Sequence, residues 1–327
     1  MRKWIKAHAL STYYGLALFF VLLIMAFVGA TTPAADLAEL WSGYWRFIDE
    51  NQHYTNIYTL ALYALKVSPL MWLTLLFAFA PSLAAVITTF ISDGGAGFRQ
   101  LMSRFKPWLD GVSATQGLKV YGCIFGFFLA WAACHLWIIA TWGTPEQYST
   151  SLAPFYGSII IGLPLFFVGF FLDEGGTLEE LGWRGFALPV LMQQFSPLKA
   201  TLVLGTLWWF WHMPRELPQL LSGRELDILL LNQLKFWLYC VAISILITYV
   251  FNRTGGSVWA GILIHGGLNL VNKSVGLNVV DILGFRLSEP FILLMAIVLV
   301  IGTGSELGRR RTKHSSVNQG RSQNDTA

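Results

Sequence analysis

The chain has 327 residues, of which 55% are hydrophobic and only 12% charged. A soluble domain carries about 25% charged residues and could not cover this much apolar surface, so a soluble enzyme is excluded. High hydrophobicity also excludes a disordered chain, and three scattered cysteines exclude a disulfide scaffold. The composition predicts an all-α polytopic membrane helix bundle. Its net charge of +4 does not require nucleic acid as a partner, because membrane proteins collect Lys and Arg on their cytoplasmic side.

Eight apolar segments approach the length of a spanning helix, which needs about 20 residues. In chain order they are Ser11–Ala30, Leu70–Ile91, Val120–Ala140, Phe155–Leu172, Leu198–His212, Leu229–Val250, Ser257–Val271 and Pro290–Thr303. The fifth and seventh are short and can span only if their ends lie against other helices or in a polar cavity. The apolar stretch Ile57–Val67 contains Lys66 and predicts an interfacial helix.

The sequence of the two termini and the distribution of Lys and Arg predict the membrane topology. The basic N-terminus followed by Val28-Gly29-Ala30 resembles a signal peptide, but the apolar run Tyr14–Ala30 exceeds the usual 7–15 residues, so we expect an uncleaved anchor. With the N-terminus in the cytoplasm, most of the 22 Lys and Arg fall on cytoplasmic segments, which places both termini inside. The polar, basic tail from Ser305 onwards is expected to be disordered.

Two adjacent carboxylates, Glu179 and Glu180, lie beside an apolar segment. An ionisable residue at membrane depth costs about a few kcal/mol, so such residues suggest function. Thr177 and Glu180 have the spacing of a capping box, which predicts that a helix begins here. Glu180 and Arg184 are four residues apart and can pair on one helix face. A cap and an ion pair would therefore explain Glu180 without any function.

Glu179 has no such structural explanation, because it lies about 100° around the helix from Glu180. Burial would raise the pKa of its carboxyl, while Arg184 and the positive end of the helix would lower it. A carboxylate held between these influences is typical of a general base.

Two histidines lie on other apolar segments. His212 closes one segment and follows Trp208 by one turn, an arrangement also typical of an aromatic belt at a membrane interface. His265 and Asn269 are four residues apart and project from one helix face. This second pair could equally form a hydrogen bond that holds the bundle together.

Together, the three clusters resemble the motifs of the type II CAAX prenyl endopeptidases and of their bacterial relatives, the CPBP intramembrane proteases or Abi family. The motifs are Glu179-Glu180-x-x-x-Arg184, Trp208-x-x-x-His212 and His265-x-x-x-Asn269. The core resemblance covers about a third of the chain, and Ala80–Ala85 followed by a Gly-rich, basic loop is also similar to this family. The family usually has Phe at the position of Trp208.

The resemblance implies an eight-helix membrane core and hydrolysis of a peptide bond in a peptide or membrane-protein substrate. It assigns Glu179 to the activation of water, His212 to positioning that water, and Glu180 and Arg184 to the support of the site.

It further implies that His265 and Asn269 donate hydrogen bonds to the oxyanion. Amide hydrolysis needs a base for water and donors for the developing negative charge, so the residue types suit the reaction. The expected location is a bacterial plasma membrane, with the lipid bilayer as the surroundings and no nucleic-acid partner.

The expected organisation has four parts: N-terminal membrane helices and loops at 1–154, the catalytic core at 155–275, the last span at 276–304 and a disordered basic cytoplasmic tail at 305–327. One conflict concerns the site, because Glu179 precedes the fifth segment and His212 lies at its far end. Either the Glu179 helix dips into the membrane or the fifth segment is misplaced.

A metal is the main alternative within this interpretation, since the family has been described both as metalloproteases and as metal-free glutamate proteases. Two histidines and one glutamate could hold zinc with water as the fourth ligand. The His-Glu-x-x-His motif is absent, and asparagine suits an oxyanion donor better than a zinc ligand. We therefore expect no metal cofactor, and zinc is the alternative.

Two other classes of function compete with a protease. A non-catalytic membrane scaffold or a bacteriocin-immunity-type protein could bind a partner through the same cavity, although it would not need Glu179, His212, His265 and Asn269 together. A transporter is disfavoured because paired broken helices in matching halves are not evident in the sequence.

Overall fold

The computed structural model describes residues 2–33, 43, 46, 56–66, 69–152, 167–216 and 226–309. These residues contain helices and no β-strand, as predicted for an all-α fold. The α-helices are α1 Arg2–Ala7, α2 Ala9–Thr31, α4 Ile57–Lys66, α5 Trp72–Ser103, α6 Ala114–Trp142, α7 Pro145–Leu152, α9 Glu174–Glu180, α10 Leu188–Leu191, α11 Pro197–Trp211, α13 Leu226–Arg253, α14 Val258–Val271, α15 Leu277–Leu283 and α16 Ser288–Thr303. Two π-helical segments, Leu181–Ala187 and Asn272–Gly276, follow α9 and α14.

Within the described residues, five helical segments are long and apolar enough to cross a membrane: Ala9–Thr31, Pro69–Ser103, Ala114–Trp142, Leu226–Arg253 and Ser288–Glu306. They coincide with the first, second, third, sixth and eighth predicted spans. The fifth and seventh correspond to α11 with 15 residues and α14 with 14. The fourth, Phe155–Leu172, lies mostly outside the described residues. A total of eight spans therefore stays a prediction.

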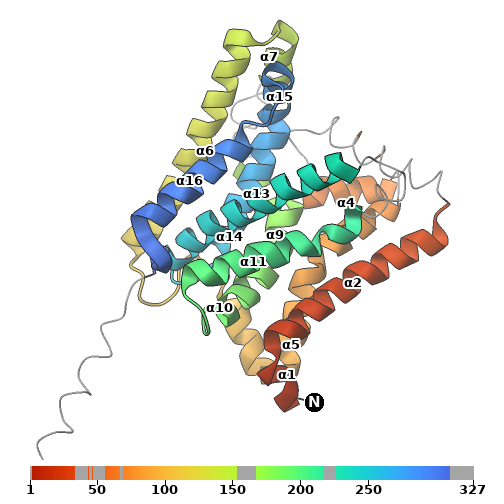
Figure 1. Ribbon diagram of the computed structural model, residues 1–327, viewed down its shortest axis with the longest axis vertical. Helices are drawn as coiled ribbons and strands as arrows, with labels where there is room; N and C mark the ends of the chain where they lie inside the picture. The colour runs from red at the N-terminus through yellow and green to blue at the C-terminus, as the bar shows by residue number, and fades with distance from the viewer. Residues whose placement is uncertain are drawn as a thin grey trace, which may run out of the picture.

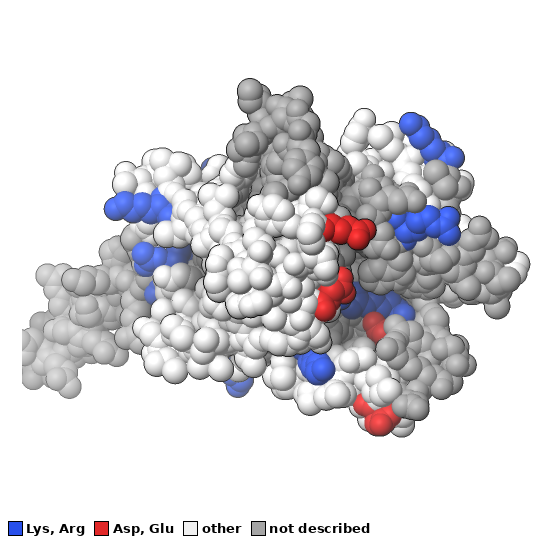
Figure 2. All heavy atoms as spheres, turned by 90° about the horizontal axis from the view of Figure 1, so that it is seen from above, with Lys and Arg blue, Asp and Glu red and all other residues white. Residues whose placement is uncertain are grey.

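The surface of the bundle is apolar in the way that a lipid environment requires. Large hydrophobic side chains are exposed along α2, α13 and α16, among them Phe19, Leu23, Leu230, Leu234, Leu294 and Ile301. Charged side chains form only scattered groups on the face in Figure 2, between wide uncharged areas. Exposed apolar surface of this extent marks a membrane interaction, and the chain is an integral membrane protein.

The short helix α9 lies inside the bundle, where it packs against α5 on one side and α14 on the other. Helix α2 lies along α5 at one side of the molecule, and α6 and α16 form the opposite side (Figure 1). Helices α11 and α13 pack on each other, and α13 also contacts α14 and α16. This arrangement encloses the polar residues of α9 with helices from both halves of the chain.

Helix α5 differs from the sequence prediction at its second half. The Gly-rich, basic stretch after Ala85 was expected to form a loop, but the helix continues to Ser103. The chain bends at Gly94, whose φ of 66° is accessible to glycine at little cost. The prediction was wrong because one glycine absorbs the bend while the residues on either side remain helical.

The C-terminal end of the described chain is docked on the bundle. The Asn252 side-chain amide donates hydrogen bonds to the carbonyls of Glu306 and Leu307, and the Leu307 side chain is buried. The described chain thus extends to residue 309, past the predicted start of the disordered tail. The rest of that tail lies outside the described residues.

Glycines allow the close approach of α9 to its neighbours. A Cβ on Gly176 would lie 2.9 Å from the backbone nitrogen of Gly266 and from the carbonyl oxygen of Ile262 on α14. A Cβ on Gly182 would lie 2.5 Å from the backbone carbonyl of Pro81 on α5. Backbone atoms cannot move aside as the end of a flexible side chain can. Gly176 therefore sets the distance between α9 and α14, and Gly182 sets the distance between the following π-helical segment and α5.

We expect the substitution Gly182→Ala to destabilise the protein, because the added methyl group must push the π-helical segment away from α5. Overpacking of this kind costs about 1–3 kcal/mol. The matched control is Gly122→Ala on α6, where a Cβ has nothing within 4 Å and alanine improves helix propensity. Thermal unfolding in detergent should show a lower midpoint for Gly182→Ala only; equal midpoints would contradict the close packing.

Candidate active site

Helix α9 begins with Asp173 as its cap. The Asp173 carboxylate accepts a hydrogen bond from the backbone N–H of Gly176 at 2.7 Å, as an N-cap residue does. The predicted capping box of Thr177 and Glu180 is therefore wrong: the helix begins three residues before Thr177, whose hydroxyl donates to the Phe171 carbonyl instead. An aspartate just before the helix competes better than Thr177 for the free N–H groups of the first turn.

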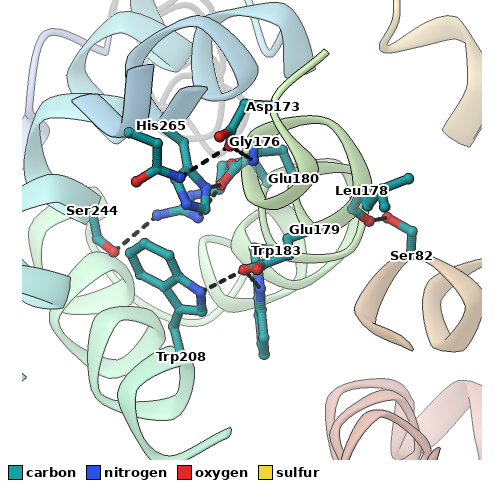
Figure 3. Close-up of polar contacts among 12 residues, drawn as sticks. Ser82, Asp173, Gly176, Leu178, Glu179, Glu180, Trp183, Trp208, Ser244 and His265 are labelled. Carbon is teal, nitrogen blue, oxygen red and sulfur yellow. Dashed lines mark hydrogen bonds and ion pairs between the residues drawn. The ribbon is translucent and has the colours of Figure 1, made fainter. Parts of the chain in front are cut away.

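Glu180 forms the predicted ion pair with Arg184, and the structure adds partners from two other helices (Figure 3). The Arg184 guanidinium donates to Glu180 Oε1 at 2.7 Å and to the Ser244 hydroxyl at 3.0 Å. The Nδ1 atom of His265 lies 3.0 Å from the same Oε1 atom. Glu180 and Arg184 are both fully buried. This network ties α9 and the π-helical segment to α13 and α14.

Glu179 has a different environment from its neighbour Glu180. Its Oε2 atom accepts hydrogen bonds from two indole N–H groups, Trp208 at 2.8 Å and Trp183 at 3.3 Å. Among the described residues, no cation pairs with it and its Oε1 atom accepts no hydrogen bond. The Glu179 side chain is buried, and α9 lies outside the five candidate spans. Burial raises the pKa of the Glu179 carboxyl to about 7, against the opposing effects of His265 and of the Trp208 hydrogen bond.

Trp208 contacts both Glu179 and Arg184, the ion-pair partner of Glu180. Its N–H holds Glu179, while its ring lies beneath the Arg184 guanidinium, whose central carbon is 4.9 Å from the ring centroid. The Trp208 ring also contacts the His265 ring edge-on at 5.0 Å. A phenylalanine at this position could stack in the same place but could not donate to Glu179.

His265 and Asn269 point to the same place beside α9. A Cβ on Gly175 would lie 2.9 Å from His265 Nε2 and 3.4 Å from Asn269 Nδ2, so both nitrogen atoms converge on the α-carbon of Gly175. Asn269 Nδ2 also donates to Asp173 Oδ1 at 3.0 Å. The carboxylate of Glu180 can only accept from His265 Nδ1, so that nitrogen carries a proton.

His212 lies at the end of α11, enclosed by aromatic rings. Its Nδ1 atom is 2.9 Å from the Trp208 carbonyl, which can only accept, so Nδ1 carries the proton and Nε2 has a lone pair in the neutral ring. The rings of Trp208, Trp211 and Phe236 surround it. The structure thus connects His212 to Glu179 through Trp208. The conflict between their places in the sequence disappears because α9 lies inside the bundle, against the end of α11.

Sequence reasoning missed a second polar cluster beside the first. Lys273 pairs with Glu174 at 2.9 Å and lies 3.7 Å from Asp173 Oδ2. An aspartate immediately before a helix is a recognised start signal, which could have identified Asp173. Lys273 follows Asn269 by four residues, so the helical spacing could have placed it on the same side as the predicted pair.

A zinc ion needs three or four His, Cys or carboxylate ligands around one point. In the described part of the chain, no three such side chains gather in a way that could hold a metal ion. Glu180 and His265 bind each other, and the Glu179 Oε2 atom is occupied by two indole N–H groups. These residues do not fit a zinc site, and the metal-free reaction stays a prediction.

The fold and the site define an α-helical integral membrane protein with a buried pair of glutamates in unlike surroundings. The sequence pattern of the family described as Type II CAAX prenyl endopeptidase Rce1-like matches residues 158–271, which contain all six predicted site residues. This part of the chain is thus similar to that family, which is also known as CPBP or Abi and is a family of hydrolases.

A curated protein shows a similar resemblance. The "CAAX prenyl protease 2" of Methanococcus maripaludis is 30% identical over 131 residues, which make up 38% of this chain and 47% of that relative. The chain thus spans about half the length of the curated relative that it matches.

We expect Arg184→Met to destabilise the fold strongly, because it leaves the Glu180 carboxylate buried without its main counter-charge. Removing one partner of a buried ion pair costs about 3–5 kcal/mol. The control is Arg309→Met, which breaks a partly exposed pair with Glu306 and should cost about 0–1 kcal/mol. Chemical unfolding in detergent measures both; a small loss for Arg184→Met would mean that Glu180 does not depend on the pair.

Proposed function

We propose that the protein is an intramembrane endopeptidase that hydrolyses a peptide bond with water activated by Glu179. The observation that carries the proposal is the contrast between the two glutamates. Glu180 is neutralised by Arg184 and His265, whereas Glu179 is buried without a cation and keeps one oxygen free of hydrogen bonds from the described residues. Neighbouring carboxylates in unlike surroundings typically take different roles in catalysis.

In this mechanism, Glu179 Oε1 removes a proton from water as that water attacks the carbonyl carbon of the scissile bond. The two indole N–H groups hold the other oxygen and fix the direction of the carboxylate. The Nε2 lone pair of neutral His212 accepts a hydrogen bond from the same water. The protonated Glu179 then passes its proton to the leaving amine, so the base is regenerated.

The negative charge that develops on the carbonyl oxygen is stabilised by His265 and Asn269, whose nitrogen atoms converge beside Gly175. His265 acts as an imidazolium: Nδ1–H donates to Glu180, and Nε2–H is aimed at the oxyanion. Glu180 and Arg184 are positioning residues, because they hold His265 and do not touch the substrate. Asp173 has the same role for Asn269. Donors fixed before the reaction are typically the largest contribution to such catalysis.

The substrate class follows from the family and from the surroundings of the site. A protease family acts on peptide bonds, and a site enclosed by apolar helices favours a membrane peptide or membrane-protein segment as substrate. Most Lys and Arg lie on segments that the proposed topology places inside, so we infer that both termini are cytoplasmic.

The direct test compares Glu179→Gln with Glu180→Gln on purified protein and a library of membrane peptides, with new peptide ends detected by mass spectrometry. Glu179→Gln should lower turnover about 10²–10⁴-fold and keep the unfolding midpoint, because only the base is lost. Glu180→Gln should lower both turnover and stability, because it breaks the buried pair with Arg184. Cleavage by Glu179→Gln at the wild-type rate would reject Glu179 as the base, and no cleavage by wild type would favour a scaffold.

The pH dependence gives a second test of the same assignment. A base with a pKa of about 7 is active when deprotonated, so turnover should rise with pH through about 7. Trp208→Phe removes an N–H donor that stabilises the carboxylate, which raises the pKa of Glu179 and should move the rising limb about one unit towards higher pH. Trp209→Phe is the control, because the Trp209 indole donates to Gln233. Identical profiles for the two variants would contradict the contact.

A further inference from the structure

We propose that the face of α14 adjacent to the one that carries His265 and Asn269 binds one anionic phospholipid. A groove of about 610 Å³ runs between α6, α13, α14 and α16. This volume lies within the range of roughly 300–1,000 Å³ that is typical of small-molecule sites. It is separate from the glutamate site, because Ile264 and Leu268 form its wall while the neighbouring His265 and Asn269 project towards α9.

The groove is polar at one end and apolar along its length. Lys119 at the beginning of α6 and Arg253 at the end of α13 line the polar end, together with the hydroxyls of Ser113 and Thr115. The two helix ends are held together by a hydrogen bond from the Gln116 side-chain amide to the Arg253 carbonyl at 3.1 Å. The structure therefore fixes two cationic side chains at a single mouth.

The charges at this mouth are not neutralised by the protein. Within the described part of the chain, neither Lys119 nor Arg253 takes part in an ion pair. The nearby Glu306 is already paired with Arg309. Basic pockets between membrane helices bind the headgroups of anionic lipids, so charge complementarity selects a phosphate over a neutral ligand.

The depth of the groove suits an acyl chain. Phe127 lies about 12 Å from Lys119 along α6, at a rise of 1.5 Å per residue. On α13, Leu246 lies about 10 Å from Arg253 by the same measure. Half of a hydrocarbon core is about 15 Å. An acyl chain that follows these walls stays parallel to the helices, with its headgroup at the basic mouth where the apolar segments end.

Two cysteines on α6 provide a probe and its control within the natural chain. Cys123 lines the groove, whereas Cys134 is on the same helix outside it, and both are exposed. The rate of modification by N-ethylmaleimide, measured by mass spectrometry on protein in nonionic detergent, reports access to each. Phosphatidylglycerol at ten times its dissociation constant should slow Cys123 on the order of tenfold by mass action and leave Cys134 unchanged. Phosphatidylcholine with the same acyl chains should protect Cys123 much less.

The double variant Lys119→Gln/Arg253→Gln tests the headgroup contact. Each basic residue contributes about a fivefold factor, so phosphatidylglycerol should bind about 25-fold more weakly. The control Lys199→Gln/Lys235→Gln removes the same charge from exposed positions outside the groove. It should bind phosphatidylglycerol as tightly as wild type does. Native mass spectrometry gives an independent readout: one phosphatidylglycerol per wild-type chain, and none retained by the groove variant.

Several outcomes would overturn the proposal. Equal protection by the two phospholipids would mean that charge does not select the ligand, and equal protection of Cys123 and Cys134 would mean a general detergent effect. Stronger protection by an uncharged isoprenoid alcohol would assign the groove to an apolar chain instead. Peptide cleavage is not part of this test, so its result is independent of the proposed protease activity.

Discussion

A buried carboxylate that is shared by an arginine and a histidine holds the centre of this protein together. Glu180 accepts from Arg184 and from His265, which joins the short helix α9 to α14, and Arg184 extends the contact to Ser244 on α13. Glu180 Oε2 lies against Gly261, where any side chain would collide with it. Breaking such a network costs free energy, because the remaining charge is then buried away from water without its partner. The neighbouring Glu179 is left with no cationic partner among the described residues.

Helix α14 separates two different environments. One face presents His265 and Asn269 to α9, and the adjacent face contributes Ile264 and Leu268 to the groove between α6, α13 and α16. Glycines on α14 permit the tight contact with α9. A ligand in the groove would therefore contact the adjacent side of the helix without reaching the polar site. Under the two proposals, lipid and peptide would meet one helix through side chains that differ by about 100° in direction.

Much of this could be predicted from the sequence, because the relevant spacing is local. Apolar length predicted the five helical segments of the described chain that are long and apolar enough to span a membrane, and a separation of four residues predicted the Glu180–Arg184 pair. The same spacing placed His265 and Asn269 on one face. Where local signals competed, the prediction was wrong: Thr177 was chosen as the cap instead of Asp173, and a kinked helix at Gly94 was taken for a loop.

Only the tertiary structure decided which side chains meet across the bundle. Trp208 donates to Glu179 across 29 residues of sequence, His265 reaches Glu180 across 85 and Asn269 reaches Asp173 across 96. No periodicity encodes such contacts, because they depend on how closely the helices approach each other. The sequence by itself determined an all-α membrane protein and identified the polar residues that we propose for its site. Helix packing decided that Glu180 is neutralised while Glu179 is not, since desolvation and partners arise only when the helices come together.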